Sequence, residues 1–344
     1  MACLALSALH QVGDDIQGFT LGFVVPSFQD STSNHWRMIV LRDISDLGSI
    51  TGPVVLAIGF FDGVHIGHQQ VIAQALQRAA ERHATMVLMT FDPHPLRVLR
   101  PEIAPKLLCS MEHQARVLTS YGVTHTLLCK FDREFAAIGA EDFVLQLKNA
   151  CALDSIFVGE AWRFGKGRRG DVALIQSLGV AAFGVPSVMH GDKVVSSTLV
   201  RQAVERGDLA EAKALLGRDY SVLGRVIEGN KLARTLGFPT ANLDVQNEQL
   251  PPAGVYAVRA FIDGTWRAAV ANLGRRPTVE PDAQALSLEV HVFDLDADLY
   301  GHLIEVSFIE HLRDEVKFPG LDALKSQIAR DCVRAREVLA GGGE

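Results

Sequence analysis

Residues 59–68 read Gly59-Phe60-Phe61-Asp62-Gly63-Val64-His65-Ile66-Gly67-His68. The apolar run 54–58 precedes them and has the composition of a buried strand, whereas residues 69–83 carry the spacing of an amphipathic helix. The stretch is therefore predicted to be the loop of a strand–loop–helix unit. Backbone N–H groups at a helix start favour anions, and Gly63 and Gly67 let a ligand approach the backbone closely. The pattern predicts a phosphate-binding loop.

Two histidines, His65 and His68, lie three residues apart in this loop. Near a helix start both imidazoles can face one ligand, and as hydrogen-bond donors they can stabilise charge on a reacting phosphate. The alternative is a pair of surface or capping histidines. The buried strand and the Asp62-Gly63 pair before the histidines favour the phosphate-handling interpretation.

Apolar runs alternate with helical patterns through the first half of the chain. Continuous apolar strands that alternate with helices are typical of a parallel sheet covered on both faces. We therefore expect a doubly wound, Rossmann-like α/β domain over residues 38–217, with ligands at the carboxyl ends of its strands. The predicted strands are 54–58, 86–91, 126–129 and 155–158, and the predicted helices are 69–83, 112–121, 140–150, 198–206 and 209–216.

The pattern changes from residue 220 onward, where short strand candidates are separated by turn signals. Such spacing predicts a mainly antiparallel β-barrel domain over residues 218–344, closed by a C-terminal helix at 321–339. Residues 1–37 are interpreted as an N-terminal extension, disordered or arising from a mis-assigned start, and an ordered first element is the alternative. The strand candidates of the second domain are 222–228, 254–262, 266–272, 286–293 and 303–309.

Composition excludes several classes of protein. The net charge of −7 over 344 residues argues against a nucleic-acid binder, which normally carries a basic face. Five scattered cysteines without a Cys-x-x-Cys pair fit a reducing cytoplasm better than a disulfide framework or a zinc cluster. No apolar run approaches the ~20 residues that cross a bilayer, so we expect no membrane partner.

The loop at 59–68 resembles the nucleotidylyltransferase superfamily, which carries His-x-Gly-His between a strand and a helix. The run 196–201, Ser-Ser-Thr-Leu-Val-Arg, is similar to the second signature of that superfamily. Two further segments, Phe91-Asp92-Pro93-His94-Pro95 and the basic loop that begins at Arg163, resemble the adenylyltransferase half of the bacterial bifunctional riboflavin kinase/FAD synthetase family.

A second glycine-containing signature, Gly237-Phe238-Pro239-Thr240-Ala241-Asn242, lies about 170 residues further on and resembles the riboflavin kinase signature of the same family. Thr240 and Asn242 offer oxygens that suit Mg²⁺ and a nucleotide phosphate. Glu289 occupies the position where the family places its general base. A Pro-Thr turn with a capping asparagine is the structural alternative for the signature, and an outward strand glutamate is the alternative for Glu289.

The resemblance covers residues 38–340 and implies two ATP-dependent reactions. The second domain would phosphorylate riboflavin to FMN, and the first would transfer AMP from ATP to FMN, giving FAD and pyrophosphate. Magnesium, ATP, riboflavin, FMN and FAD are the implied ligands, in a cytoplasmic enzyme with small-molecule partners. The implied catalytic residues are His65, His68, Arg201 and Glu289, and the implied binding residues are Gly59, Phe61, Asp62, Gly63, Gly67, Asp92, His94, Arg163, Ser196, Ser197, Thr198, Gly237, Pro239, Thr240, Asn242 and Arg313.

Two rival functions remain at this point. One is a narrower enzyme with one degenerate half, for which the first domain is the candidate because Ala161 departs from the family pattern. The other is a non-catalytic flavin-binding module that retains both folds.

Overall fold

The computed structural model describes residues 38–229, 237–275 and 286–341. The predicted N-terminal extension, residues 1–37, lies outside them. Within the described part of the chain, no helix combines the length and the apolar character needed to cross a membrane.

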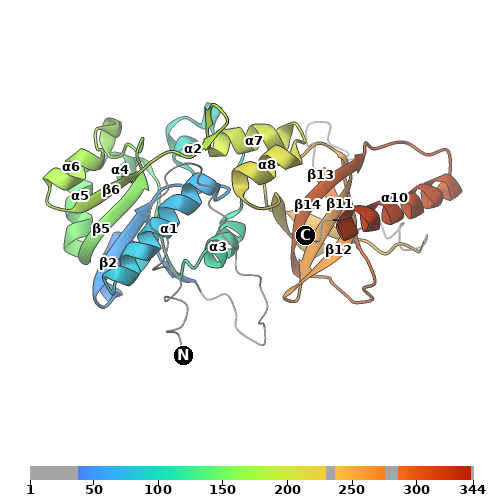
Figure 1. The fold of residues 1–344 in the computed structure, drawn as a ribbon, viewed down its shortest axis with the longest axis horizontal. Coiled ribbons are helices and arrows are strands. Elements are labelled where there is room, and N and C mark those ends of the chain that lie inside the picture. The colour runs from blue at the N-terminus through green and yellow to red at the C-terminus, as the bar shows by residue number, and fades with distance from the viewer. Residues whose placement is uncertain (1–37, 230–236, 276–285, 342–344) are drawn as a thin grey trace, which may run out of the picture. The chain divides into compact units, whose positions relative to one another are not determined.

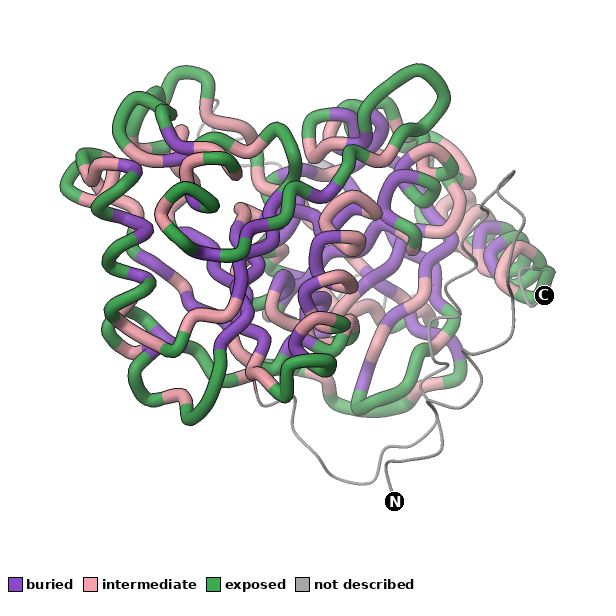
Figure 2. Tube along the Cα trace, turned by 60° about the vertical axis from the view of Figure 1, so that its left-hand side comes forward, coloured by how far each residue is buried: buried purple, intermediate pink, exposed green. Residues whose placement is uncertain are grey.

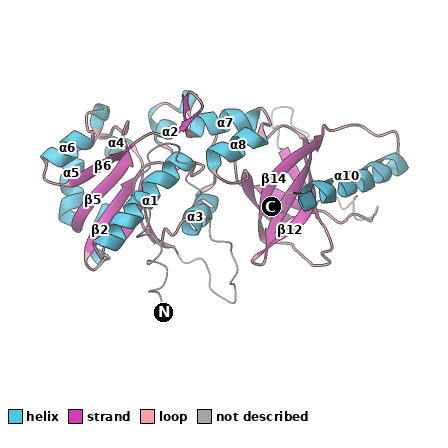
Figure 3. Ribbon diagram, viewed as in Figure 1, coloured by secondary structure: helices cyan, strands magenta, loops and turns pink. Residues whose placement is uncertain are grey.

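A six-stranded parallel sheet forms the first domain, as predicted (Figures 1 and 3). Its order is β1-β4-β3-β2-β5-β6: from β2 the chain adds β3 and β4 on one side and β5 and β6 on the other, while β1 lies at the edge beside β4. The two directions part between β2 and β5, which makes the carboxyl end of β2 the topological switch point where such sheets bind ligands. The strands are β1 (Ile39–Leu41), β2 (Pro53–Ile58), β3 (Thr85–Asp92), β4 (His125–Lys130), β5 (Ala152–Gly159) and β6 (Ala181–Val185).

Helices cover both faces of this sheet because successive residues of its strands point to opposite sides. On β2, Val55 and Ala57 pack with α1 (Ile66–Glu81) and α3 (Met111–Ser120). Val54 and Leu56 pack on the other side with α5 (Ala140–Ala150) and α6 (Val172–Ser177). Figure 2 shows the resulting buried layer between exposed helix surfaces. Shorter elements are η1 (Ile44–Ser49), α2 (Pro95–Leu99), η2 (Pro101–Ile103), α4 (Arg133–Ala136), η3 (Lys166–Arg168), β7 (Met189–His190) and β8 (Lys193–Val194).

Two helices, α7 (Ser197–Glu205) and α8 (Leu209–Leu216), lead into the second domain. This domain is a closed antiparallel barrel in the order β10-β13-β12-β11-β14-β9, which confirms the predicted barrel. The helix α10 (Leu321–Gly341) packs on its outer side against β11, β12 and β14. The barrel strands are β9 (Ser221–Ile227), β10 (Ala241–Val245), β11 (Gly254–Ile262), β12 (Thr265–Arg275), β13 (Leu286–Val292) and β14 (Leu303–Arg313).

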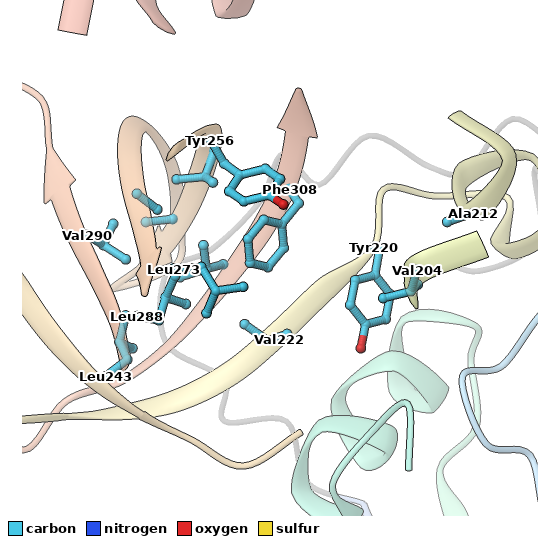
Figure 4. Close-up of a cluster of buried hydrophobic side chains, with 14 of the residues drawn as sticks. Val204, Ala212, Tyr220, Val222, Leu243, Tyr256, Leu273, Leu288, Val290 and Phe308 are labelled. Carbon is cyan, nitrogen blue, oxygen red and sulfur yellow. The ribbon is translucent and has the colours of Figure 1, made fainter. Parts of the chain in front are cut away.

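Alternate residues of the barrel strands fill its interior (Figure 4). Leu243, Leu273 and Leu288 are opposite one another on three paired strands and are almost fully buried. The ring of Tyr256 meets that of Phe308 edge-on, with 5.1 Å between centroids. Because side chains alternate along each strand, the residues between these apolar ones point outward, which decides where the second site can form.

A buried polar network joins the loop before α3 to the barrel. Asn247 is 5% exposed, and its amide nitrogen donates to the carbonyl of Leu108 while its amide oxygen accepts from the N–H of Leu223 at 2.9 Å. Next to it, His113 Nε2 lies 3.3 Å from a carboxylate oxygen of Glu305. Burial opposes charge on both partners, but the pKa of His113 is raised by Cys109 and Glu305, and contact with His113 lowers the pKa of Glu305.

We expect Asn247→Ala to lower the free energy of unfolding by about 1–3 kcal/mol, because it leaves the buried N–H of Leu223 without its partner and removes one of the two hydrogen bonds to the Leu108 carbonyl. Urea denaturation followed by circular dichroism measures the change. Gln246→Ala is the matched control, since Gln246 is exposed and should change stability by less than about 0.5 kcal/mol. Equal stability of both variants would contradict a stabilising role for the network.

Candidate active sites

The loop between β2 and α1 leaves the sheet at the switch point with an unusual backbone. Phe61, Gly63 and Val64 all have positive φ, at 54°, 76° and 43°. A β-branched residue rarely adopts this conformation, so Val64 is a strained position that the surrounding structure must hold in place. The loop ends at His65, which is the N-cap of α1. The strand–loop–helix prediction is confirmed, and the helix begins three residues earlier than predicted.

The two histidines of the loop stack on each other. Their ring centroids lie 3.6 Å apart at an interplanar angle of 18°. His65 Nδ1 accepts the backbone N–H of His68 at 3.3 Å, so the neutral ring of His65 carries its proton on Nε2. Burial, with a smaller effect from Arg218 and Arg201, lowers the pKa of His65 to about 4. Burial also lowers the pKa of His68 well below its usual range. At neutral pH both rings are therefore neutral donors.

Asp62 is the most enclosed acidic group of this site, at 1% exposure. Its carboxylate accepts the backbone N–H groups of Leu108 and Cys109 at 3.0 and 3.1 Å, and it forms an ion pair with Arg201 at 2.6 Å. The sequence pattern assigns Asp62 to ligand binding, whereas the structure directs its carboxylate at protein groups. This placement favours a role in positioning Arg201.

The second N-terminal signature lies directly beside the first. Ser196 caps α7 by accepting the N–H of Leu199 at 3.3 Å, and the hydroxyl of Ser197 donates to the backbone carbonyl of Asp62 at 2.8 Å. Thr198 is exposed in the first turn of α7. The helix starts of α1 and α7 therefore lie close together near the switch point, where N–H groups at a helix start favour anions.

Of the further predicted binding residues Asp92, His94 and Arg163, only His94 has a ring or hydrogen-bond contact with the loop at 59–68 in the described part of the chain. His94 caps α2 and meets the ring of Phe60, the neighbour of Gly59 and Phe61, with 4.2 Å between centroids. Burial, followed by the charges of Arg201 and Arg97, lowers the pKa of His94 to about 4. Asp92 is exposed at the end of β3.

Arg163 lies apart from this group. It is exposed and donates to the carbonyl of its neighbour Trp162 at 2.9 Å. Among the contacts of the described residues, none joins Arg163 to His65, His68 or Arg201.

The second site is a cavity of about 320 Å³ on the outer face of the barrel, beside α10. A row of three polar residues crosses its floor: Asn242 on β10 pairs with Glu289 on β13, which pairs with Asn272 on β12. Cross-strand partners share one face of a sheet, so the three side chains point the same way. Thr240 also lines the cavity. The predicted set of Thr240, Asn242 and Glu289 is thus brought together.

Space around Asn242 depends on a glycine. A Cβ atom on Gly229 would overlap the side-chain amide of Asn242. Gly237, which precedes the cavity-lining Phe238, has a φ of 90°, and the carbonyl of Pro239 accepts His291 Nδ1–H at 2.7 Å.

The far wall of the cavity is apolar with one buried ion pair. Arg313 donates through Nη2 and Nε to Asp331 of α10, at 2.7 Å and 3.0–3.1 Å. Asp331 is 7% exposed. The guanidinium also lies 5.7 Å from the centroid of Phe318. The apolar side chains of this wall are Val255, Val270, Ala271, Val316, Phe318, Leu324 and Ile328.

The donor set at this cavity suits a hard cation. A hydroxyl, an amide oxygen and a carboxylate face one space, and Mg²⁺ prefers few protein oxygens together with water and phosphate oxygens. Within the described residues, no group of three or more His, Cys, Asp or Glu is arranged to hold a metal.

Two residues that contribute to these sites escaped the sequence analysis. A third, Asn272, begins a run that resembles a riboflavin kinase motif but was not predicted as a site residue, and its cross-strand pairing with Glu289 places it in the polar row. Asp331 lies on the side of α10 that faces the cavity. Its signal in the sequence is an acidic residue in an apolar stripe, three positions after Ile328 and four before Ala335. Arg218 reaches the histidine loop from the start of the barrel domain, and no local pattern marks it.

Comparison with known proteins gives consistent results for both halves. Residues 48–199 match the family model described as FAD synthetase, and residues 216–339 match the one described as riboflavin kinase. The chain is 40% identical over 289 residues to a bifunctional riboflavin kinase/FMN adenylyltransferase of Escherichia coli K12, covering 82% of this chain and 92% of the relative. It is 36% identical to the protein of that name from Haemophilus influenzae, with 87% and 98% covered.

A solved structure shares the fold. A crystal structure titled as a macrolide-efflux protein from Streptococcus pneumoniae superimposes with a TM-score of 0.76 at 29% identity, covering 87% of this chain and 99% of that one. We take from it the common architecture.

The lowered pKa values of His65 and His94 can be tested by titration. We expect the ring nitrogens of His65 and His94 to titrate near pH 4, because burial and nearby arginines disfavour the imidazolium. Nitrogen-15 NMR titration measures this, with resonances assigned through His65→Gln and His94→Gln. The urea-denatured protein is the control, in which both should titrate near pH 6.5. Native midpoints near 6.5 would contradict the neutral-donor interpretation.

Proposed function

The chain belongs to the family of bifunctional riboflavin kinase/FMN adenylyltransferases, and from its two sites we propose which residues carry each reaction. It is a transferase that phosphorylates riboflavin to FMN and adenylylates FMN to FAD in flavin cofactor biosynthesis. Because both halves of the chain match this family, we reject the two rival functions, a one-activity enzyme and a non-catalytic flavin-binding module.

We place the domain boundary at residue 217, giving domains 38–217 and 218–344. The support is local: α8 ends at Gly217, which has a left-handed φ of 67°, and the riboflavin kinase match begins at residue 216. A left-handed glycine is a common helix terminator, and the chain changes direction there into the barrel.

For the kinase reaction we assign general-base catalysis to Glu289. The row Asn242–Glu289–Asn272 across the cavity floor is the observation that carries this assignment. The apolar wall near Phe318 suits a flat flavin ring, which leaves the ribityl chain to point its terminal hydroxyl at the polar row. Glu289 then accepts the hydroxyl proton as the oxygen attacks the γ-phosphate of ATP.

Thr240 and Asn242 are proposed to hold the ATP phosphates and Mg²⁺ beside Glu289. When bound, the cation offsets phosphate charge and polarises the transferring group. Arg313, fixed by Asp331, supplies a cation with a constant orientation at the other side of the cavity.

For adenylyl transfer we propose that the FMN phosphate attacks the α-phosphate of ATP and that pyrophosphate leaves. Charge increases on the α-phosphate oxygens in the transition state. His65 and His68 would donate hydrogen bonds to those oxygens, and Arg201 would bind the departing pyrophosphate. The helix starts of α1 and α7 add preorganised N–H groups at the same place.

We propose the cytoplasm as the compartment of these reactions. The described cysteines Cys109, Cys129, Cys151 and Cys332 are free thiols, which fits a reducing environment. The partners are the small molecules riboflavin, FMN and ATP.

Glu289→Gln is expected to lower kcat for FMN formation by about 100-fold or more, because the amide cannot accept the proton. FAD formation from supplied FMN should stay within about twofold of the original protein. Chromatography of flavins after incubation with ATP measures both rates. Glu310→Gln is the matched control, since Glu310, on strand β14 of the same barrel, makes an exposed ion pair with Arg334 of α10. Equal loss of both reactions in Glu289→Gln would refute the division of labour.

Magnesium dependence tests the metal assignment. Excess EDTA should stop both reactions, and added Mg²⁺ should restore them. In Asn242→Ala the Mg²⁺ concentration for half-maximal FMN formation should rise about tenfold, because an oxygen ligand is lost, with no change for FAD formation. FMN formation that continues in EDTA, or an Asn242→Ala effect on both reactions, would sink the assignment.

A further inference from the structure

The strained backbone before His65 is held by hydrogen bonds to its carbonyl groups. Gly63 and Val64 both have positive φ, and Val64 is fully buried among apolar side chains. Such a conformation costs on the order of 1–3 kcal/mol and persists only where the surroundings enforce it. The position of His65 therefore depends on whatever holds the two preceding peptide units.

Arg218 donates hydrogen bonds to the carbonyls of both Gly63 and Val64. Its Nη2 donates to the carbonyl of Gly63 at 2.9 Å, and its Nη1 donates to the carbonyls of Val64 at 3.3 Å and Leu216 at 3.4 Å. Gln69 supports the same arrangement from α1, with Nε2 at 2.8 Å from the Val64 carbonyl and 2.6 Å from that of Leu216. The planar guanidinium thus links the end of α8 to the histidine loop.

The charge of Arg218 also acts on the histidine. The charged and titratable groups around His65 are His68, Arg201 and Arg218, and both arginines disfavour its imidazolium form. The same guanidinium favours the ionised form of Glu305 on β14. Arg218 is therefore embedded between the histidine loop and the barrel.

We propose that Arg218, the first residue of the kinase domain, is a positioning residue for adenylyl transfer in the other domain. It acts through the Gly63 and Val64 carbonyls on His65, since its three hydrogen bonds go to backbone carbonyls of the protein. The inference rests on the proposed role of His65 and on the boundary at residue 217. The start of the kinase domain thus contributes to adenylyl transfer, the reaction that the kinase domain does not catalyse.

The test compares Arg218→Met and Arg218→Lys in the full-length protein. Arg218→Met keeps the length of the side chain but removes the donors and the charge, whereas Arg218→Lys keeps the charge and one point of donation. We expect kcat for FAD formation from FMN to fall about tenfold or more in Arg218→Met and less in Arg218→Lys. KM for ATP should change by less than about threefold, because no ligand contact is lost.

Two readouts separate positioning from general stability. FMN formation by the same variants should stay within about twofold of the original protein. The NMR titration midpoint of His65 should move to higher pH in Arg218→Met, where a neighbouring positive charge is gone, and should stay close to the original in Arg218→Lys. Arg225→Met is the matched control, because Arg225 donates to the carbonyl of Gly301 at 2.7 Å within the barrel alone.

Full FAD formation with an unchanged His65 midpoint in Arg218→Met would overturn the inference, and so would an equal fall in both reactions. If Arg218→Met does not fold, Arg218→Lys decides alone: a fall in kcat for FAD formation of about threefold or more with intact FMN formation supports it, and the original rates refute it. The variant His65→Ala distinguishes failure of the role proposed for His65 from failure of the positioning role proposed for Arg218. If His65→Ala forms FAD normally, the proposed role of His65 has failed; if only the Arg218 variants do, the positioning inference has failed.

Discussion

The carboxylate of Asp62 is the contact on which the first site most depends. It gathers the backbone N–H groups of Leu108 and Cys109 and the guanidinium of Arg201 around one buried group. Burial raises the pKa of Asp62, and the ion pair with Arg201 and the N–H donors act in the opposite direction. A buried carboxylate without such partners would be strongly unfavourable, so the loop, the segment around residue 108 and α7 are mutually required.

The contact between Asp62 and Leu108 also connects the first site to the barrel. Leu108 receives hydrogen bonds at its carbonyl from Asn247 and from the hydroxyl of Tyr220, both in the second domain. Its N–H donates to Asp62, so one residue connects the barrel to the loop at 59–65. With Arg218 at the histidine side, the barrel supports the first site at two separate points. The two domains therefore share a polar framework as well as an apolar core.

Periodicity and motif were enough to predict the two fold classes, because the buried strands are continuous in sequence and the helices have clear stripes. The strand β10 (Ala241–Val245) was missed, since it is short, mixed in polarity and overlaps the Pro-Thr signature. The proximity of His65 and His68 was predictable because both lie in one motif, where local geometry fixes their separation. Asp62 was predicted as a ligand-binding residue, but the partners of its carboxylate are protein groups 46 or more residues away, where no local pattern reports them. Arg218 and Asp331 act across tertiary contacts for the same reason.

The absence of a side chain at Gly229 has a consequence for how this sequence can vary. The amide of Asn242 fills the volume that a Cβ atom would need, so the two positions share a single space. An alanine at residue 229 would be mild on an exposed loop, yet here it would push a proposed phosphate and Mg²⁺ ligand out of line with Glu289. Substitution of Gly229 by a residue with a side chain is therefore disfavoured for as long as residue 242 is an asparagine. Part of the kinase chemistry is thus preserved by a residue that offers no functional group at all.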